Sequence, residues 1–148
     1  MYRILIIALM VLSSCTKDNI IITNVDDRIQ PYLNEFIADA KANGVNVERL
    51  NTQDLVILIK EELEGVGVGP TTAGLAWKMN REGVFIEIRE SHWEESTELS
   101  RKWMLYHELG HDLFNLSHRE TGIMRTHTST RLSGVSDFVW TDFFELAP

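Results

Sequence analysis

The chain has 148 residues, a formal charge of −8 and 24% charged residues. This length is enough for one domain with a single hydrophobic core and too short for two. Its 44% apolar content is ordinary for a soluble globular protein, and its 14 basic residues are scattered and form no basic stripe, so we expect no nucleic-acid partner.

Residues 1–14 have the features of an export signal. Arg3 precedes an apolar run over 4–12, which is far shorter than the roughly twenty residues of a membrane-spanning helix. Leu12-Ser13-Ser14-Cys15 resembles the bacterial lipobox, whose cysteine is lipidated and becomes the mature N-terminus. We therefore expect a lipoprotein signal peptide and lipidation of Cys15; a plain signal peptide with an incidental cysteine is the alternative.

The expected attachment to a membrane is through lipid alone. Cys15 is the only cysteine, so no intramolecular disulfide forms. Loss of residues 1–14 removes one basic residue and takes the charge from −8 to −9, which anionic headgroups do not attract. Thr16 follows the cysteine, and the enteric sorting rule for lipoproteins then points to the outer rather than the inner membrane. We expect a tether over 15–24 and a folded domain over 25–148 in the cell envelope.

The first predicted element of the domain is a helix. Asp26 or Asp27 is placed to cap it, and Asn43-Gly44 is a good C-terminal stop. Ile20 to Ile22, within the tether, could instead add a strand to the domain. The apolar residues at helical spacing are Ile29, Leu33, Phe36, Ile37 and Ala40.

The middle of the chain predicts strands. The run LVILI over 55–59 is short and β-branched, which favours a buried strand, and a helix over 52–64 is the alternative. TAGLAWKM over 72–79 and GVFIEIRE over 83–90 predict a hairpin, because three polar residues separate them. Residues that share one face of the second strand are Val84, Ile86 and Ile88.

Two further helices complete the predicted α+β domain, which has a mixed twisted sheet. The first begins either at a capping box of Ser91 and Glu94 or at Ser96 or Thr97, and continues without proline to Phe114. The second lies over 136–146. Its residues that must dock on the core are Phe138, Val139, Trp140, Phe143 and Phe144.

The stretch HELGHDLFNLSH, from His107 to His118, predicts a metal site in the second half of the first of these helices. Residues four apart lie one turn apart on the same side of a helix, so His107 and His111 can bind one metal ion. Glu108 lies about 100° around the axis, which places it beside a water on that metal. This is the logic of the H-E-x-x-H zinc motif, in which the glutamate is the general base. The alternative is a helix that merely carries histidines.

This stretch resembles the metzincin clan of zinc metallopeptidases, whose pattern is H-E-x-x-H-x-x-G-x-x-H followed by a methionine turn. The departures are Phe114 at the glycine position and a third histidine one residue late, at His118. Both are explained if the helix runs one residue further and Asn115 makes the left-handed turn, because asparagine is the next-best residue there. A small family of exported metallopeptidases of the Bacteroidetes is similar in having this spacing.

A hydrolytic zinc site needs three protein ligands and one open position. His118 is the predicted third ligand, and acidic ligands at Asp137 or Glu120 are the alternatives. His92 and His127 have no partner at a useful spacing and are interpreted as surface residues.

The motif also suggests roles for three neighbouring residues. The resemblance implies that Met124, in Gly122-Ile123-Met124, forms an apolar floor beneath the histidines; the alternative is an ordinary core methionine. Gly110 lowers helix stability by about 1 kcal/mol relative to alanine. We expect that it allows close backbone packing beside the metal. Tyr106 points away from the first ligand and is not expected to stabilise a transition state.

The resemblance also implies how a substrate binds. In metzincins the last strand before the active helix lies at the sheet edge and pairs with an extended peptide, and residues 83–89 hold that place in chain order. An interior strand is the alternative. The side chains that would bind substrate are not identified by the sequence.

The sequence thus predicts a monomeric, lipid-anchored zinc endopeptidase that acts on polypeptides. One Zn²⁺ is held by His107, His111 and His118, a water on that ion is activated by Glu108, and Met124 and Asn115 support the site. The alternatives are a zinc amidase acting on a non-peptide or cell-wall substrate, and a non-catalytic binding lipoprotein with a vestigial metal site.

Overall fold

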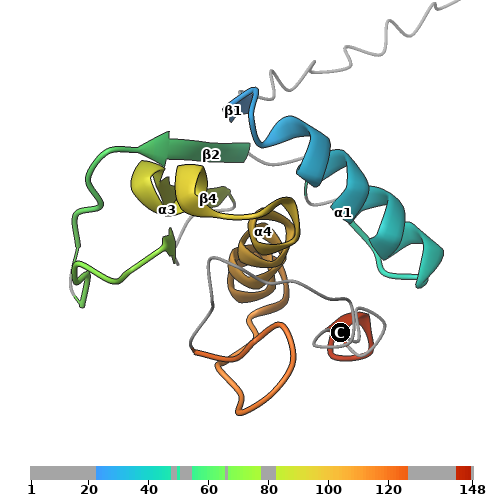
Figure 1. The fold of residues 1–148 in the computed structure, drawn as a ribbon. Coiled ribbons are helices and arrows are strands. Elements are labelled where there is room, and N and C mark those ends of the chain that lie inside the picture. The colour runs from blue at the N-terminus through green and yellow to red at the C-terminus, as the bar shows by residue number, and fades with distance from the viewer. Residues whose placement is uncertain are drawn as a thin grey trace, which may run out of the picture.

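The structure is a computed structural model that describes residues 23–47, 50, 55–65, 67–77, 83–126 and 143–147. Within them the chain forms an α+β arrangement of a mixed four-stranded sheet and three helices (Figure 1). The helices are α1 (Gln30–Ala42), α3 (Glu90–Glu95) and α4 (Glu98–Phe114). Over the described ranges, none of them has the length and apolar character to cross a bilayer.

The sheet has the strand order β1-β2-β4-β3. Its strands are β1 (Thr23–Val25), β2 (Leu55–Lys60), β3 (Gly74–Ala76) and β4 (Val84–Arg89). The first three in space are parallel, and β3 is antiparallel to β4. The strand over LVILI and the hairpin are therefore confirmed, although β3 is shorter than the predicted strand.

Two predictions about the sheet need correction. The strand over 83–89 is interior, because β4 pairs with β2 on one side and β3 on the other, so β3 is the edge strand beside it. The predicted tether also extended too far, since Thr23 and Asn24 are in β1, where their backbones pair with Leu55 and Val56. The export signal, Cys15 and Ile20 to Ile22 lie outside the described residues.

One face of the sheet carries the core. Burial alternates along β4, so that every second side chain is withdrawn from solvent, as a half-buried strand requires. Each such aliphatic side chain contributes about 1.5–3 kcal/mol to folding when fully buried. The buried residues of β2 and β4 are Leu55, Ile57, Val84, Ile86 and Ile88.

Helices α1 and α4 lie beside each other against this core (Figure 1). Phe36 of α1 packs edge-on against Tyr106 of α4, with ring centroids 4.9 Å apart. Phe143 and Phe144 are buried in the same aromatic group, which confirms that this end of the chain docks on the core. Residues 136–142 of the predicted closing helix, including Phe138, Val139 and Trp140, lie outside the described residues.

The helix caps differ partly from the predictions. The N-cap of α1 is Ile29 and not Asp26 or Asp27, because Asp26 Oδ1 instead accepts the Arg28 backbone N–H in a turn before the helix. The capping box of Ser91 and Glu94 does not form, since α3 begins directly after β4. Thr97 caps α4, as the second alternative expected, and its side chain accepts the Ser100 N–H.

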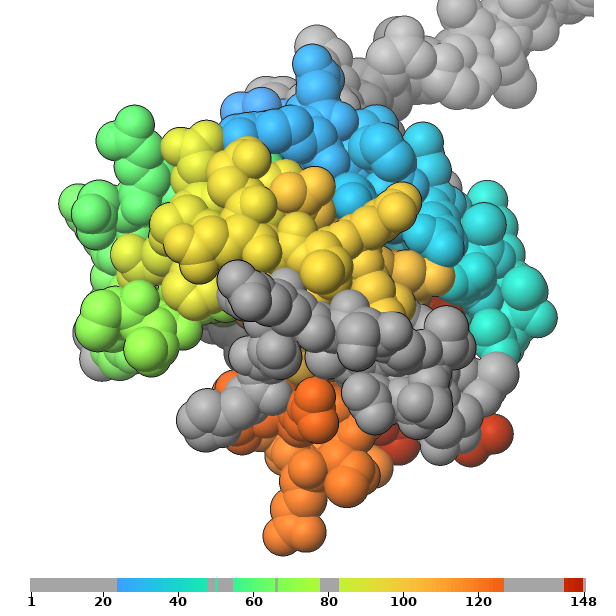
Figure 2. Space-filling view, viewed as in Figure 1, coloured from blue at the N-terminus to red at the C-terminus, as the bar shows by residue number. Residues whose placement is uncertain are grey.

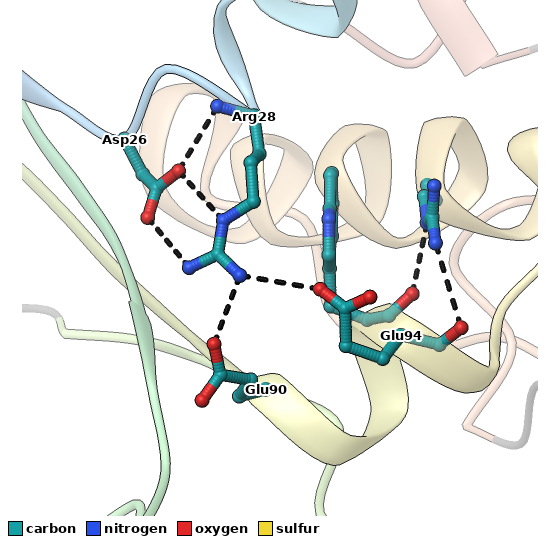
Figure 3. A network of polar contacts seen from close by, with 6 residues as sticks. Asp26, Arg28, Glu90 and Glu94 are labelled. Carbon is teal, nitrogen blue, oxygen red and sulfur yellow. Dashed lines mark hydrogen bonds and ion pairs between the residues drawn. The ribbon is translucent and has the colours of Figure 1, made fainter.

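An arginine links the beginning of α1 to α3. Figure 3 shows the guanidinium of Arg28 between three carboxylates, those of Asp26, Glu90 and Glu94, at 2.9, 2.9 and 3.2 Å. The Arg28 side chain is 42% exposed, and exposed ion pairs contribute only about 0–1 kcal/mol each. The network therefore fixes local geometry more than it stabilises the fold.

Candidate metal centre

Helix α4 places two histidines one turn apart at the wall of the core. His107 is 6% exposed and His111 is partly exposed, so the pair spans the boundary between core and solvent. The helix ends at Asn115, whose φ of 54° and ψ of 32° are left-handed, as predicted from the missing glycine. The Leu116 N–H then donates to the Gly110 carbonyl at 3.0 Å and turns the chain back.

That turn brings the third histidine to the first two. The Nε2 atoms of His107, His111 and His118 lie 3.0, 3.1 and 3.2 Å apart in pairs, an almost equilateral triangle. Ligands that bind a tetrahedral zinc ion at about 2.0–2.1 Å are about 3.3–3.4 Å apart. The three side chains lie close enough to bind one metal ion, and no other His, Cys, Asp or Glu of the described ranges joins this cluster.

Backbone carbonyls orient two of the rings. Nδ1 of His107 lies 2.7 Å from the Ile123 carbonyl oxygen, and Nδ1 of His111 lies 2.7 Å from that of Leu116. A carbonyl only accepts, so each Nδ1 carries the proton and donates it, which leaves the Nε2 lone pair directed into the triangle. Converging lone pairs repel one another, and a cation between them removes the repulsion. The tautomers thus fit a metal.

The charge state of the first histidine agrees with this. The pKa of His107 is lowered to about 4, chiefly by burial and also by the neighbouring His111 and His118, against the opposing bond to Ile123. His107 is therefore neutral near pH 7, which is the form that binds metal ions.

Aromatic stacking also orients the imidazole ring of His107. The rings of Trp103 and His107 are nearly parallel at 27°, with centroids 4.7 Å apart, and those of His107 and His118 are also at 27°, 5.2 Å apart. The ring of His111 is nearly perpendicular to both. Trp103 lies one turn before His107, and this spacing of four residues is the sequence signal for a contact that the predicted site did not include.

Gly110 allows the segment after the histidines to approach the helix. A Cβ there would lie 2.7 Å from Met124 Sδ and 2.9 Å from Phe143 Cε2. The predicted close backbone packing is confirmed, and Met124, which is 1% exposed, packs against α4 next to the triad. The carbonyl of Ile123, its neighbour in sequence, binds His107, so Met124 is placed where it can support the site.

We expect Gly110→Ala to destabilise the protein by up to about 2 kcal/mol, because overpacking costs about 1–3 kcal/mol and the gain in helix propensity offsets only about 1 kcal/mol of it. Urea unfolding measures the change. The control is Ala38→Gly on the exposed side of α1, which should lose about 1 kcal/mol from propensity alone. If Gly110→Ala instead stabilises the protein, the close packing at this position is refuted.

Glu108 lies between α4 and the sheet edge. Its side chain is 7% exposed, and its carboxylate accepts the backbone N–H of Ala76 in β3. Burial raises its pKa to about 8, against the opposing effect of that bond. Gly74 faces the carboxylate, since a Cβ at Gly74 would lie 2.6 Å from Oε1 and 2.9 Å from Cδ. Neither contact with β3 has a signal in the sequence.

The remaining candidates do not join the cluster of three histidines or lie outside the described residues. The Tyr106 hydroxyl donates to Asp39 Oδ2 at 2.8 Å, which confirms that it points away from the site. Glu120 is exposed and His92 is on α3. Asp137 and His127 are not described.

None of the protein-family models, curated proteins or solved structures compared with this chain matches it. The site is therefore interpreted from its own geometry.

Proposed function

We propose that this protein is a zinc-dependent endopeptidase of the metzincin type, attached to the cell envelope through lipidated Cys15. The observation that carries the proposal is the triangle of Nε2 atoms, in which His118 takes part despite its late position because Asn115 makes the turn. A triad of histidines with a glutamate beside the first of them is the residue set of a hydrolytic zinc site and not of a structural one.

His107, His111 and His118 would hold the ion. When bound, zinc supplies Lewis acidity that polarises a carbonyl and lowers the pKa of a coordinated water. Glu108 accepts the proton of the attacking water and later delivers it to the leaving amine, so it must be ionised at the start. Its raised pKa in the metal-free chain gives it the basicity for this task, and a nearby positive charge favours the ionised form.

The edge strand β3 supports an extended peptide as substrate. The Trp77 N–H donates to the Phe85 carbonyl and the Arg89 N–H donates to the Ala73 carbonyl, so the backbone groups of Ala73 and Trp77 face β4. Backbone groups alternate in an antiparallel pair, and those of Gly74 and Ala76 therefore face away from β4, on the side where Glu108 accepts the Ala76 N–H. We propose that β3, and not β4, pairs with the substrate backbone. This would place the scissile bond beside Glu108, which already binds Ala76.

Gly74→Ala should lower kcat/KM for peptides by about 100-fold while the fold is retained. The added Cβ would displace most of the Glu108 side chain, since Cγ, Cδ and Oε1 all lie within 3.0 Å of it, and misplacement of a catalytic group by about 1 Å costs about 100-fold. Peptide hydrolysis and thermal unfolding are measured together. Gly69→Ala is the matched control, because a Cβ there meets nothing within 4 Å; equal activity of the two variants would contradict the contact's role.

A direct comparison of substrates separates the proposal from its alternatives. The zinc-loaded protein is incubated with an unlabelled peptide pool and with cell-wall muropeptides, and the products are identified by mass spectrometry. Cleavage within the peptides is expected. Release of products from the muropeptides alone would favour the amidase, and no product from either, with zinc bound, would favour a binding protein.

A further inference from the structure

The segment that follows the third histidine folds into a closed loop with an arginine at each end. Arg119 N–H donates to the Met124 carbonyl at 2.8 Å, and Arg125 N–H donates to that of Gly122 at 3.3 Å. The first of these bonds belongs to a parallel backbone bridge that pairs Arg119 with Arg125, and the second closes the turn between them. Both side chains consequently start from the same end of the loop, directly beside His118.

These arginines line a hollow of about 600 Å³ next to the triad. Its described walls are His118, Arg119, Glu120, Arg125 and Thr126. This volume is within the range of sites that bind small groups or side chains. A substrate that reaches the metal centre from this side must pass the hollow, because His118 belongs to both.

The charge of Arg119 is available for a partner. Three other guanidiniums of the described residues are occupied. Arg28, before α1, and Arg89, in β4, form ion pairs, and Arg101 in α4 donates to the Trp93 carbonyl. Arg119 is exposed and forms no ion pair with any residue of the described ranges. Glu120, the next residue in the chain, lines the same hollow and offsets part of the charge of Arg119.

We propose that this hollow is a subsite for an acidic side chain of the polypeptide substrate, with Arg119 as the residue that determines the preference. The inference rests on the proposed function, which supplies the polypeptide. A planar guanidinium donates two parallel N–H bonds to a carboxylate and forms an ion pair with it. A side-chain amide has the same shape but no charge, so it cannot form that ion pair. Glutamate is therefore favoured over glutamine at one position of the bound peptide.

Binding without turnover tests this subsite. Fluorescein-labelled octapeptides, alanine-rich and differing only by Glu or Gln at one position at a time, are titrated into the zinc-loaded full chain carrying Glu108→Gln, and anisotropy is recorded. At one position the Glu peptide should bind about threefold to tenfold more tightly. Adding Arg119→Gln should make the two peptides equal, and adding Glu120→Gln should widen their difference.

The control for overall charge is Lys41→Gln, which removes one positive charge from the last turn of α1 and should leave the preference intact. The subsite is refuted if no position prefers Glu, if the preference survives Arg119→Gln, or if Lys41→Gln reduces it equally. Failure of the peptidase proposal is a different result. In that case the wild-type chain would cleave no peptide while the preference and its dependence on Arg119 remain.

Discussion

Glu108→Gln is expected to lower kcat for peptide hydrolysis by about 10²- to 10⁴-fold, the usual contribution of a general base. Glutamine has nearly the same shape and still accepts the Ala76 N–H through its amide oxygen, but it cannot take a proton from water. Because Glu108 is not among the clustered ligands, the variant should bind zinc with the same stoichiometry. Turnover of a cleaved peptide is measured at equal zinc content.

The matched control for this variant is Glu98→Gln, which makes the same change at an exposed position in the first turn of the same helix. It should leave kcat unchanged. Full activity in Glu108→Gln with one zinc bound would contradict the assignment of the base, whereas loss of zinc would indicate that Glu108 is a ligand.

His118→Ala should weaken zinc binding by more than about 100-fold. Loss of a residue that merely orients a ligand costs about 10- to 100-fold in affinity, and His118 is assigned as a ligand itself. It also removes one ring of the stack on His107. Competition with a zinc-sensitive chelating dye measures the affinity of the purified protein.

His92→Ala is the control for loss of an imidazole, and it should not change zinc affinity because His92 is on α3 and outside the triad. Unchanged affinity in His118→Ala, together with a large loss in Asp137→Asn or Glu120→Gln, would show that an acidic residue is the third ligand.

The local chemistry of the site could be predicted from the sequence. The spacing of four residues on a helix places His107 and His111 together, independently of the tertiary structure. The left-handed turn at Asn115 follows from a phenylalanine where glycine is expected, since only a few residues adopt φ near 54° without large cost. The position of His118 then follows from the turn.

Contacts that depend on sheet order could not be predicted in this way. The hairpin was predicted from turn residues and alternation, but these do not determine which of its strands pairs with a third one. β4 pairs with β2, which leaves β3 at the edge and brings Gly74 and Ala76 to Glu108. The capping error at Asp26 has a similar cause, because its carboxylate binds Arg28, which also reaches across to α3.

The measurement that tests the central claim most directly is peptide hydrolysis by the purified wild-type chain as zinc is removed and restored. A quenched peptide library is added to three samples of the protein. The first is loaded with one zinc ion, the second has had its zinc removed by a chelator, and the third has had one equivalent of zinc added back. We predict cleavage at internal peptide bonds, loss of cleavage on chelation and recovery with zinc. Cleavage that persists without metal, or no cleavage at any stage while one zinc is bound, would contradict the account.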